Sequence, residues 1–231
     1  MYLSLIHIWG LLTEDEAMIK SAVDGIENIM DYTEDVYKRQ GPAGIGAAVA
    51  AARAGAKVGL IDSAGAPGGI STVGLMSHWT GTVDNALYRE ILERSARKND
   101  FSNEVTTVID PEKLKILYIE MLAESNVKLM LYTFASGVIM DGSEVKGVII
   151  ENKSGTSVIK SQIVIDASGD GDIAAKAGRN ISGTHMAHSN FRAMPICLAI
   201  GNASGTAAAI AIRKKCRPRD VSASDIQSEL E

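Results

Sequence analysis

Cysteine is scarce in this sequence: its 231 residues include only two, Cys197 and Cys216. Neither lies in a Cys-x-x-Cys pair or in another metal-ligand spacing. This argues against a disulfide framework and against a cysteine-based metal site. So few cysteines are typical of a reducing compartment, and we expect a cytoplasmic protein.

Basic and aromatic residues are also sparse. The formal net charge is −5 and no dense block of lysine and arginine occurs, which argues against a nucleic-acid partner. Aromatic residues make up 5% of the chain, whereas glycine is abundant at 22 residues. This composition favours close backbone approach and tight packing of helices on a sheet over a broad stacking surface.

Long apolar runs are rare, and the uncharged run 194–212 is the main one. Its 19 residues reach the length that spans a bilayer. The run contains Pro195, Gly201 and Asn202, which are poorly suited to lipid, so we expect a buried loop and helix and no membrane span. Residues 1–12 are apolar but lack the basic start and cleavage site of a signal peptide. Nothing in the sequence indicates an oligomeric state.

A βαβ unit is the clearest element in the pattern. The glycine-rich turn 41–46 leads into a helix of small residues, 47–54, and Gly55 is suited to end it in the left-handed conformation. The apolar run 57–62 then reads as a strand that ends in Asp62. Strand, turn, helix and strand in this order predict an α/β fold with a parallel sheet flanked by helices.

The remaining pattern completes this fold with a small antiparallel β-meander at about 128–160. Residues 1–34 form an N-terminal extension with a helix at 13–31, and residues 35–231 form one domain. In the helix at 111–125, Asp110 is suited to cap the first turn and Pro111 to occupy it. Ser224 and Gln227 fit a capping box in the last helix. The other predicted elements are helices at 84–98 and 205–215 and strands at 128–134, 137–140, 145–152 and 157–166.

The turn at Gly41, Pro42, Ala43 and Gly44 is the sharpest motif. Glycine lets the backbone approach a pyrophosphate closely, and the start of the following helix presents N–H groups to the phosphates. Asp62 follows Gly41 by 21 residues, where an acid accepts hydrogen bonds from a ribose. Together they predict a dinucleotide site. The alternative is an ordinary tight turn between strand and helix.

One position departs from that motif. In the G-x-G-x-x-G pattern Gly41 and Gly44 take the second and third glycine positions, and Arg39 takes the first. The strand before the turn should be apolar, yet residues 37–40 are Tyr-Lys-Arg-Gln. The stretches 1–9 and 35–40 resemble translated sequencing-adapter sequence, so they are left out of the predicted fold.

A second motif is the run Asp166-Ala-Ser-Gly-Asp-Gly-Asp172, which follows an apolar strand. Small residues at the carboxyl end of a strand mark a crevice in which a ligand can lie. Three aspartates in seven residues could also indicate a calcium-binding loop, but the spacing and the terminal glutamate of an EF-hand are absent.

A third motif lies near the C-terminus. His185 and His188 are spaced for zinc on a helix, but no third ligand is near, and we favour polar residues that line a pocket or the surface. We expect no metal site. The segment 201–209 reads either as a helix start that faces an anion or as a tightly packed core helix.

Four ordered motifs together resemble the FAD-dependent oxidoreductase family, within the glutathione-reductase-like and fumarate-reductase-like flavoproteins. They are the turn at 41–44, the glycine-rich loop 68–75, the run 166–172 and the segment 192–211. The resemblance covers about residues 35–231 and implies a Rossmann-like FAD-binding fold with FAD as the cofactor.

The resemblance also implies roles for particular residues. Gly41, Pro42, Ala43 and Gly44 face the FAD pyrophosphate, and Asp62 faces the adenosine ribose. Ala135 meets the adenine through its backbone. The remaining implied contacts are Gly69, Thr72 and Gly74 along the flavin, Ala167, Ser168 and Gly169 over the dinucleotide, and Gly201, Asn202, Ala203, Gly205 and Thr206 at the ribityl chain and flavin.

Family members carry a substrate or cap region that this chain lacks, because residues 177–178 run directly into 179–182. We place the deletion at 178/179. His185 and Arg192 are the candidates for proton donor and oxyanion binder. The leading hypothesis is an FAD-dependent oxidoreductase, or the cofactor half of one, that acts on an unidentified small molecule. A non-catalytic FAD-binding remnant and an NAD(P)-binding dehydrogenase domain are the alternatives.

Overall fold

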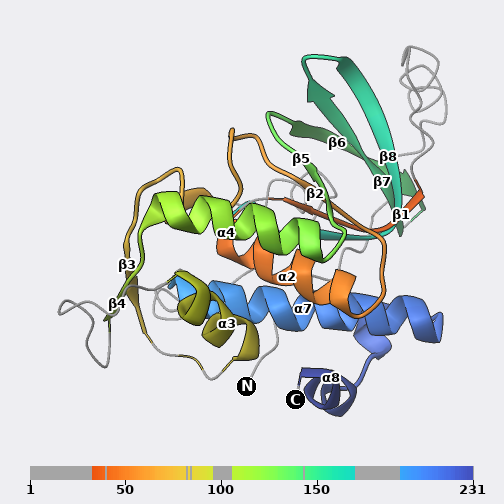
Figure 1. Ribbon diagram of the computed structural model, residues 1–231. Helices are drawn as coiled ribbons and strands as arrows, with labels where there is room; N and C mark the ends of the chain where they lie inside the picture. Colours follow the sequence, from red (N-terminus) through yellow and green to blue (C-terminus); the bar gives the residue numbers. More distant parts are fainter. Residues whose placement is uncertain are drawn as a thin grey trace, which may run out of the picture.

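The computed structural model describes residues 33–39, 41–81, 83, 85–95, 106–142, 144–169 and 193–230. Its centre is a six-stranded sheet in the order β5-β2-β1-β8-β7-β6. Helices α4, α2 and α7 lie side by side next to the sheet (Figure 1). The strands of this sheet are β1 (Thr33–Arg39), β2 (Val58–Ile61), β5 (Lys128–Met130), β6 (Phe134–Asp141), β7 (Glu144–Asn152) and β8 (Gly155–Asp166).

The helices follow the predicted order with shifted ends. Asp110 caps α4 by accepting from the backbone N–H groups of Glu112 and Lys113, and Pro111 occupies the first turn, as predicted. Gly55 takes the predicted left-handed conformation, with φ of +92°. The helices are α2 (Gly41–Arg53), α3 (Ala86–Ser95), α4 (Pro111–Glu124), α7 (Met194–Lys214) and α8 (Ala223–Leu230), with short 3₁₀ turns at Gly69–Ser71 and Pro218–Asp220. A separate two-stranded antiparallel sheet pairs β3 (His78–Thr80) with β4 (Thr106–Val108), and α3 lies between these strands in sequence.

The sheet is parallel on one side and antiparallel on the other. Strands β5, β2, β1 and β8 pair in parallel, whereas β8, β7 and β6 pair antiparallel. The predicted meander therefore begins too early: 128–130 is a parallel strand against β2, and the antiparallel part starts at Phe134. Strand β8 serves both halves, because its first residues pair with β7 and its later ones with β1.

Strand β1 is part of the fold, so the prediction that residues 35–40 lie outside it is wrong. Despite its polar sequence, it lies in the middle of the sheet, paired in parallel with β2 on one side and β8 on the other. Backbone pairing with two neighbours satisfies its N–H and C=O groups whatever its side chains are. The predicted helix at 13–31 lies outside the described residues.

Glycines make the contact between α2 and α7 unusually close. A methyl group on Gly201 would lie 2.0 Å from the Ala43 carbonyl oxygen, and one on Gly205 would lie 2.2 Å from that of Ala47. From the other side, a methyl group on Gly46 would lie 2.4 Å from the Leu198 carbonyl oxygen. The two helix backbones touch, and only glycine at these positions allows it.

The last two helices differ from their predicted ends. Helix α7 begins at Met194, eleven residues before the expected start at Gly205. Pro195 falls in its first turn, where the missing proline N–H costs nothing. Helix α8 is capped by Ser222, whose hydroxyl accepts from the Asp225 N–H at 3.1 Å, so the capping box predicted at Ser224 is wrong by two residues.

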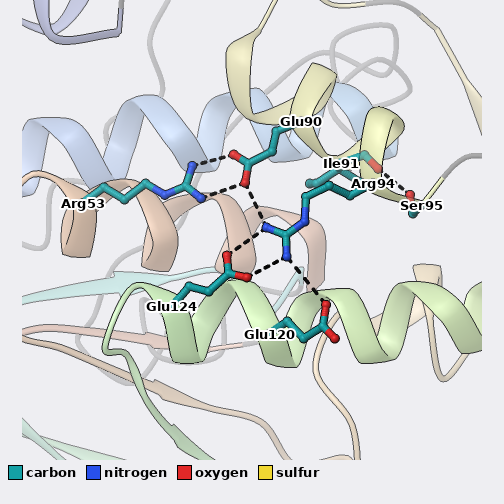
Figure 2. Close-up of polar contacts among 7 residues, drawn as sticks. All are labelled: Arg53, Glu90, Ile91, Arg94, Ser95, Glu120 and Glu124. Carbon is teal, nitrogen blue, oxygen red and sulfur yellow. Dashed lines mark hydrogen bonds and ion pairs between the residues drawn. The ribbon is translucent and has the colours of Figure 1, made fainter.

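An ion-pair cluster joins α2, α3 and α4 (Figure 2). Glu90 accepts from both terminal nitrogens of Arg53, at 2.6 and 2.8 Å, and from Arg94 at 3.2 Å. Arg94 in turn donates to both oxygens of Glu124, at 2.9 and 2.8 Å, and lies 3.6 Å from Glu120. The hydrogen bond from Arg53 is the main cause that lowers the pKa of Glu90.

Within the described residues, α7 alone is long and apolar enough to cross a membrane. Two thirds of its most apolar window is buried inside the fold, against α2 and α8. The run therefore forms a core helix along its whole length, where the sequence predicted a buried loop followed by a helix.

Candidate cofactor-binding site

Three loops leave the same edge of the sheet next to one another. The end of β1 is in register with the ends of both neighbours: Arg39 pairs with Ile61 on β2 and with Asp166 on β8. Asp62 and Ala167 follow Ile61 and Asp166 directly, and Gly41 is the second residue after Arg39. Strand β2, which follows β1 in the chain, lies on one side of β1, and β8 lies on the other side. Sheets of this type bind ligands in a crevice at the carboxyl end of the central strand.

Glycine backbones meet at this edge. Gly41 opens α2 with φ of +81°, and Gly69 has φ of +55°. A methyl group on Gly69 would lie 3.1 Å from Gly41 Cα and 3.3 Å from its nitrogen, and one on Gly41 would lie 3.9 Å from the Ala167 carbonyl oxygen. The turn after β1, the loop after β2 and the turn after β8 therefore converge with no side chain between Gly41 and Gly69.

This convergence meets the requirements of a pyrophosphate. The first turn of α2 contains Gly41, Pro42, Ala43 and Gly44, and the N–H groups of a first turn have no partner within the helix. Those N–H groups and the helix dipole attract a phosphate, and glycine lets it approach the backbone. A proline in this turn gives up an N–H that the helix does not need.

Asp62 is buried at the end of β2, although it carries a carboxylate, and hydrogen bonds hold it in place. The residue is 1% exposed, and its Oδ1 accepts from the Ala64 N–H at 2.8 Å. Its backbone N–H donates to Met130, and its carbonyl accepts from Thr133. A preorganised acceptor at this point suits a ribose, which presents two hydroxyl donors.

The loop 68–76 is held from within. The Thr72 hydroxyl donates to the Pro67 carbonyl at 2.7 Å, the Ser71 hydroxyl donates to Gly68 at 2.6 Å, and the Gly74 N–H donates to Gly69. Thr72 is fully buried, so it shapes this loop. Against that fixed backbone, the large apolar side chains of the loop are exposed: Ile70, Val73, Leu75 and Met76.

Tyr118 of α4 supports the same loop and was not predicted from sequence. A methyl group on Gly68 would lie 2.6 Å from the Tyr118 ring, and Gly68 has φ of +106°. The ring is fully buried, and this burial raises the pKa of the Tyr118 hydroxyl, which the neighbouring Ser71 hydroxyl lowers by less. Tyr118 lies in the apolar face of α4, so the sequence pattern does not distinguish it from the other core residues of that helix.

The turn after β8 has a second fixed carboxylate. Asp166 is buried, and its Oδ1 accepts from the Ser168 N–H at 2.9 Å. Gly169 then has φ of +85°, a conformation that favours glycine. Residues 167–169 form a tight turn beside Gly41, so the structure brings this predicted group to the edge of the sheet. The rest of the motif, 170–172, lies outside the described residues.

Ala135 lies in the antiparallel half of the sheet, near the start of β6. It is buried on β6 opposite Ile150, and the pairing of β6 with β7 is irregular between Ala135 and Gly137. Such an irregularity frees backbone groups from regular pairing. Its contact with adenine stays a prediction.

The predicted group at 201–206 lies elsewhere. Gly201, Asn202, Ala203, Gly205 and Thr206 are all buried in the middle of α7. The expectation that a helix starts there is therefore wrong, and the contact of these residues with the flavin stays a prediction. The alternative of a tightly packed core helix is what the structure has, because small residues permit the contact with α2.

His185 and Arg192 lie outside the described residues, and their suggested roles stay predictions. Among the residues that the structure describes, no three histidine, cysteine or acidic side chains are grouped as metal ligands would be. In that part of the chain, the predicted residues that come together are those around Gly41, Asp62, Gly69 and Ala167.

Fold and site together define an α/β protein of the dinucleotide-binding class. The family model described as FAD dependent oxidoreductase matches the chain in two segments, residues 40–179 and 176–230. The chain belongs to the FAD-dependent oxidoreductase family, and its cofactor is FAD. This decides against the NAD(P)-binding alternative. No curated protein matches the sequence.

Solved structures share the Rossmann-type fold at low sequence identity. THI4 of Thermovibrio ammonificans has 19% identity and a TM-score of 0.52, over 75% of this chain and 72% of that one. A geranylgeranyl bacteriochlorophyll reductase-like protein of Thermoplasma acidophilum has 21% identity and a TM-score of 0.51, over 66% and 44%. An open flavocytochrome c3 fumarate reductase has 16% identity and a TM-score of 0.50, over 67% and 36%. The chain thus spans less than half of the last two proteins.

The residues at this edge of the sheet leave room for FAD. Side chains on Gly41 and Gly69 would fill the space where the three loops meet, and both glycines have the positive φ that other residues rarely adopt. A glycine-lined edge at a helix start accommodates two phosphates, and the acid at the end of the adjacent strand accommodates the attached ribose.

Proposed function

We propose that this chain is the cofactor-binding half of an FAD-dependent oxidoreductase that transfers hydride or electrons between a small molecule and flavin. The observation that carries the proposal is the convergence of Gly41, Gly69 and Ala167 at the carboxyl ends of β1, β2 and β8. Asp62 lies one strand to the side of that point.

Each strand end has a different task in this proposal. The turn after β1 binds the pyrophosphate through backbone N–H groups, and Asp62 after β2 holds the adenosine ribose. The turn after β8 closes over the dinucleotide with small residues. The proposed cofactor contacts are Gly41, Pro42, Ala43, Gly44, Asp62, Gly69, Gly74, Ala135, Ala167, Ser168 and Gly169, with Thr72 holding the loop that carries two of them.

FAD, when bound, supplies the electron acceptor and donor of the reaction. The protein's part is to orient it and to keep water from its reactive end. The exposed apolar side chains of the loop 68–76 offer a surface of the kind that excludes water, and the buried Thr72 and Tyr118 keep that loop in place. We propose, from the sequence alone, that His185 donates the proton in the reaction and that Arg192 binds an oxyanion.

A second candidate is an FAD-binding protein without turnover. The observation that favours it is the family match in two segments that meet at residues 176–179, where the sequence predicts a deleted cap region. A deletion there leaves the cofactor half intact and removes the region that would bind a substrate. The two candidates share the FAD site and differ in chemistry alone.

The test of the proposal uses the purified full chain, incubated with FAD and then freed of excess flavin. We expect a flavin absorbance spectrum and the release of FAD on denaturation. Anaerobic titration then separates the two candidates: reduction of the bound flavin by a small-molecule donor supports the oxidoreductase. Reduction by dithionite but by none of a panel of hydroxy acids, amines and amino acids supports the non-catalytic form.

A further inference from the structure

Tyr132 is an aromatic residue in an unfavourable backbone conformation. It lies between β5 and β6 with φ of +51°, a left-handed conformation that bulky side chains rarely adopt. Its side chain gains little from the core in return, because the residue is 67% exposed. Backbone strain at an exposed tyrosine is not explained by the packing of the fold, and residues held this way concentrate at ligand sites.

Hydrogen bonds bind this tyrosine to the loop that contains Asp62. The Tyr132 N–H donates to the Ala64 carbonyl at 3.1 Å, and the next N–H, that of Thr133, donates to the Asp62 carbonyl at 3.0 Å. The Asp62 carboxylate itself accepts from Ala64. Tyr132 and Asp62 are therefore parts of one hydrogen-bonded unit at the ends of β2 and β5.

The Tyr132 ring rests on a glycine. A methyl group on Gly65 would lie 2.2 Å from the Tyr132 hydroxyl oxygen and 2.6 Å from the ring carbon that bears it. Because Gly65 has no side chain, the Tyr132 ring can occupy this space. The backbone at Gly65 then sets the orientation of the ring. Phe134, two residues further on, is 54% exposed, so a second large aromatic side chain lies in the same short segment.

The strand order gives the position of this ring along the dinucleotide. Neighbouring strands run β5, β2, β1 and β8. Their ends carry Tyr132, Asp62, Gly41 and Ala167 in the same order. If the pyrophosphate lies at Gly41 and the ribose at Asp62, the next group outward, beside β5, is the adenine base.

We propose that Tyr132 is the adenine platform of this protein: its ring stacks on the adenine of FAD while Asp62 holds the ribose. This inference rests on the proposed FAD site. Stacking suits the ring because every base has an aromatic face, and a tyrosine fixed in advance loses little freedom when the base arrives. Gly65 is a positioning residue, which acts through the ring that it supports.

The test compares four proteins: the wild type, Tyr132→Asn, Tyr132→Phe and Gly65→Ala. Asparagine tolerates the left-handed conformation, so Tyr132→Asn removes the ring without adding strain. Tyr132→Phe keeps the ring, and Gly65→Ala displaces it. For each protein, the dissociation constants of FAD and of ADP are measured by calorimetry, and the melting temperature is measured without ligand.

We expect Tyr132→Asn to weaken FAD binding by about 5- to 100-fold, with an unchanged or higher melting temperature. ADP, which has the adenosine and the two phosphates but no flavin, should lose the same factor. Tyr132→Phe should bind FAD as the wild type does, and Gly65→Ala should resemble Tyr132→Asn.

Failure of the two proposals is distinguishable. A wild type that binds no FAD overturns the proposed function and the adenine platform together. A wild type that binds FAD, with a Tyr132→Asn variant whose affinity is within twofold of it, overturns the platform alone. The platform is also overturned if Tyr132→Phe loses as much affinity as Tyr132→Asn, or if Tyr132→Asn loses affinity only together with a lower melting temperature.

Discussion

Gly69 lies directly against Gly41: a methyl group on Gly69 would be 3.1 Å from Gly41 Cα. The two residues are far apart in sequence, and each belongs to a different loop at the carboxyl edge of the sheet. Their contact joins the turn that begins α2 to the loop that follows β2. This contact brings two glycine backbones to the place where a pyrophosphate would bind.

The first prediction concerns Gly69→Ala. We expect a loss of about 1–2 kcal/mol in stability, since alanine is strained at φ of +55°. FAD affinity should fall as well, because the methyl group pushes on Gly41. Calorimetric titration with FAD and thermal unfolding measure the two effects.

Gly142→Ala is the matched control for that variant. Gly142 has φ of +54°, so alanine there has the same backbone cost, but nothing lies within 4 Å of the added methyl group. It should lose similar stability and keep its FAD affinity. Equal loss of FAD affinity in both variants would contradict a specific role for the contact between Gly41 and Gly69.

The second prediction is that Asp62→Asn weakens FAD binding by about tenfold, since hydrogen bonds to a charged acceptor contribute about 1.5–3 kcal/mol. Asparagine keeps an oxygen that can accept from the Ala64 N–H, so the turn itself is expected to persist. Unfolding curves should therefore change little while the FAD titration shifts. An unchanged FAD titration would remove Asp62 from the ribose site.

The third prediction concerns the helix contact. Glycine to alanine in a helix usually stabilises it by about 1 kcal/mol. At Gly201 we expect the reverse, a loss of about 1–3 kcal/mol, because the methyl group would lie 2.0 Å from the Ala43 carbonyl oxygen. Urea unfolding measures the change. A more stable Gly201→Ala variant would show that α2 and α7 are not packed as described.

The fourth prediction is a pH dependence that comes from Glu90. Its pKa is lowered in the folded protein, first by the hydrogen bond from Arg53, so the folded state holds the proton less readily than the unfolded chain. The contribution to stability is therefore present above the unfolded value of about 4.5 and is lost as the pH falls below it. Glu90 is partly exposed, which limits the contribution to about 1 kcal/mol or less.

Glu90→Gln tests this contribution. The variant should be slightly less stable than the wild type at pH 7, and the difference should shrink as the pH falls below the usual range of a glutamate. Glu93→Gln, an exposed position on the same helix, is the control. A difference between Glu90→Gln and wild type that stays constant down to pH 3 would contradict the assignment of the effect to Glu90.

Helix starts, helix caps and the acid at the end of β2 were predicted well, because the rules behind them are local. Glycine at the start of α2, an acid at the end of β2 and a proline after the Asp110 cap each have a preferred conformation that neighbouring residues determine. The family resemblance, confirmed by the match, rested on the same local motifs.

Two errors came from contacts that local patterns do not contain. The polar strand β1 is held by backbone pairing on both sides, which a hydrophobicity pattern does not register. The segment 201–206 has the small residues of a phosphate-binding helix start, but a tightly packed core helix needs small residues as well. Only the contact with α2 distinguishes these two structures. Tyr132 was missed for a third reason: its unfavourable φ is set by the hydrogen bonds to the Asp62 loop.

The central claim is that this chain holds FAD at the edge where Gly41, Asp62, Gly69 and Ala167 meet. The most direct measurement is calorimetric titration of the purified chain with FAD, followed by quantification of the flavin released on denaturation. We predict saturable binding of one FAD per chain that Gly69→Ala weakens and Gly142→Ala does not. A folded, colourless protein that takes up no FAD would contradict the account.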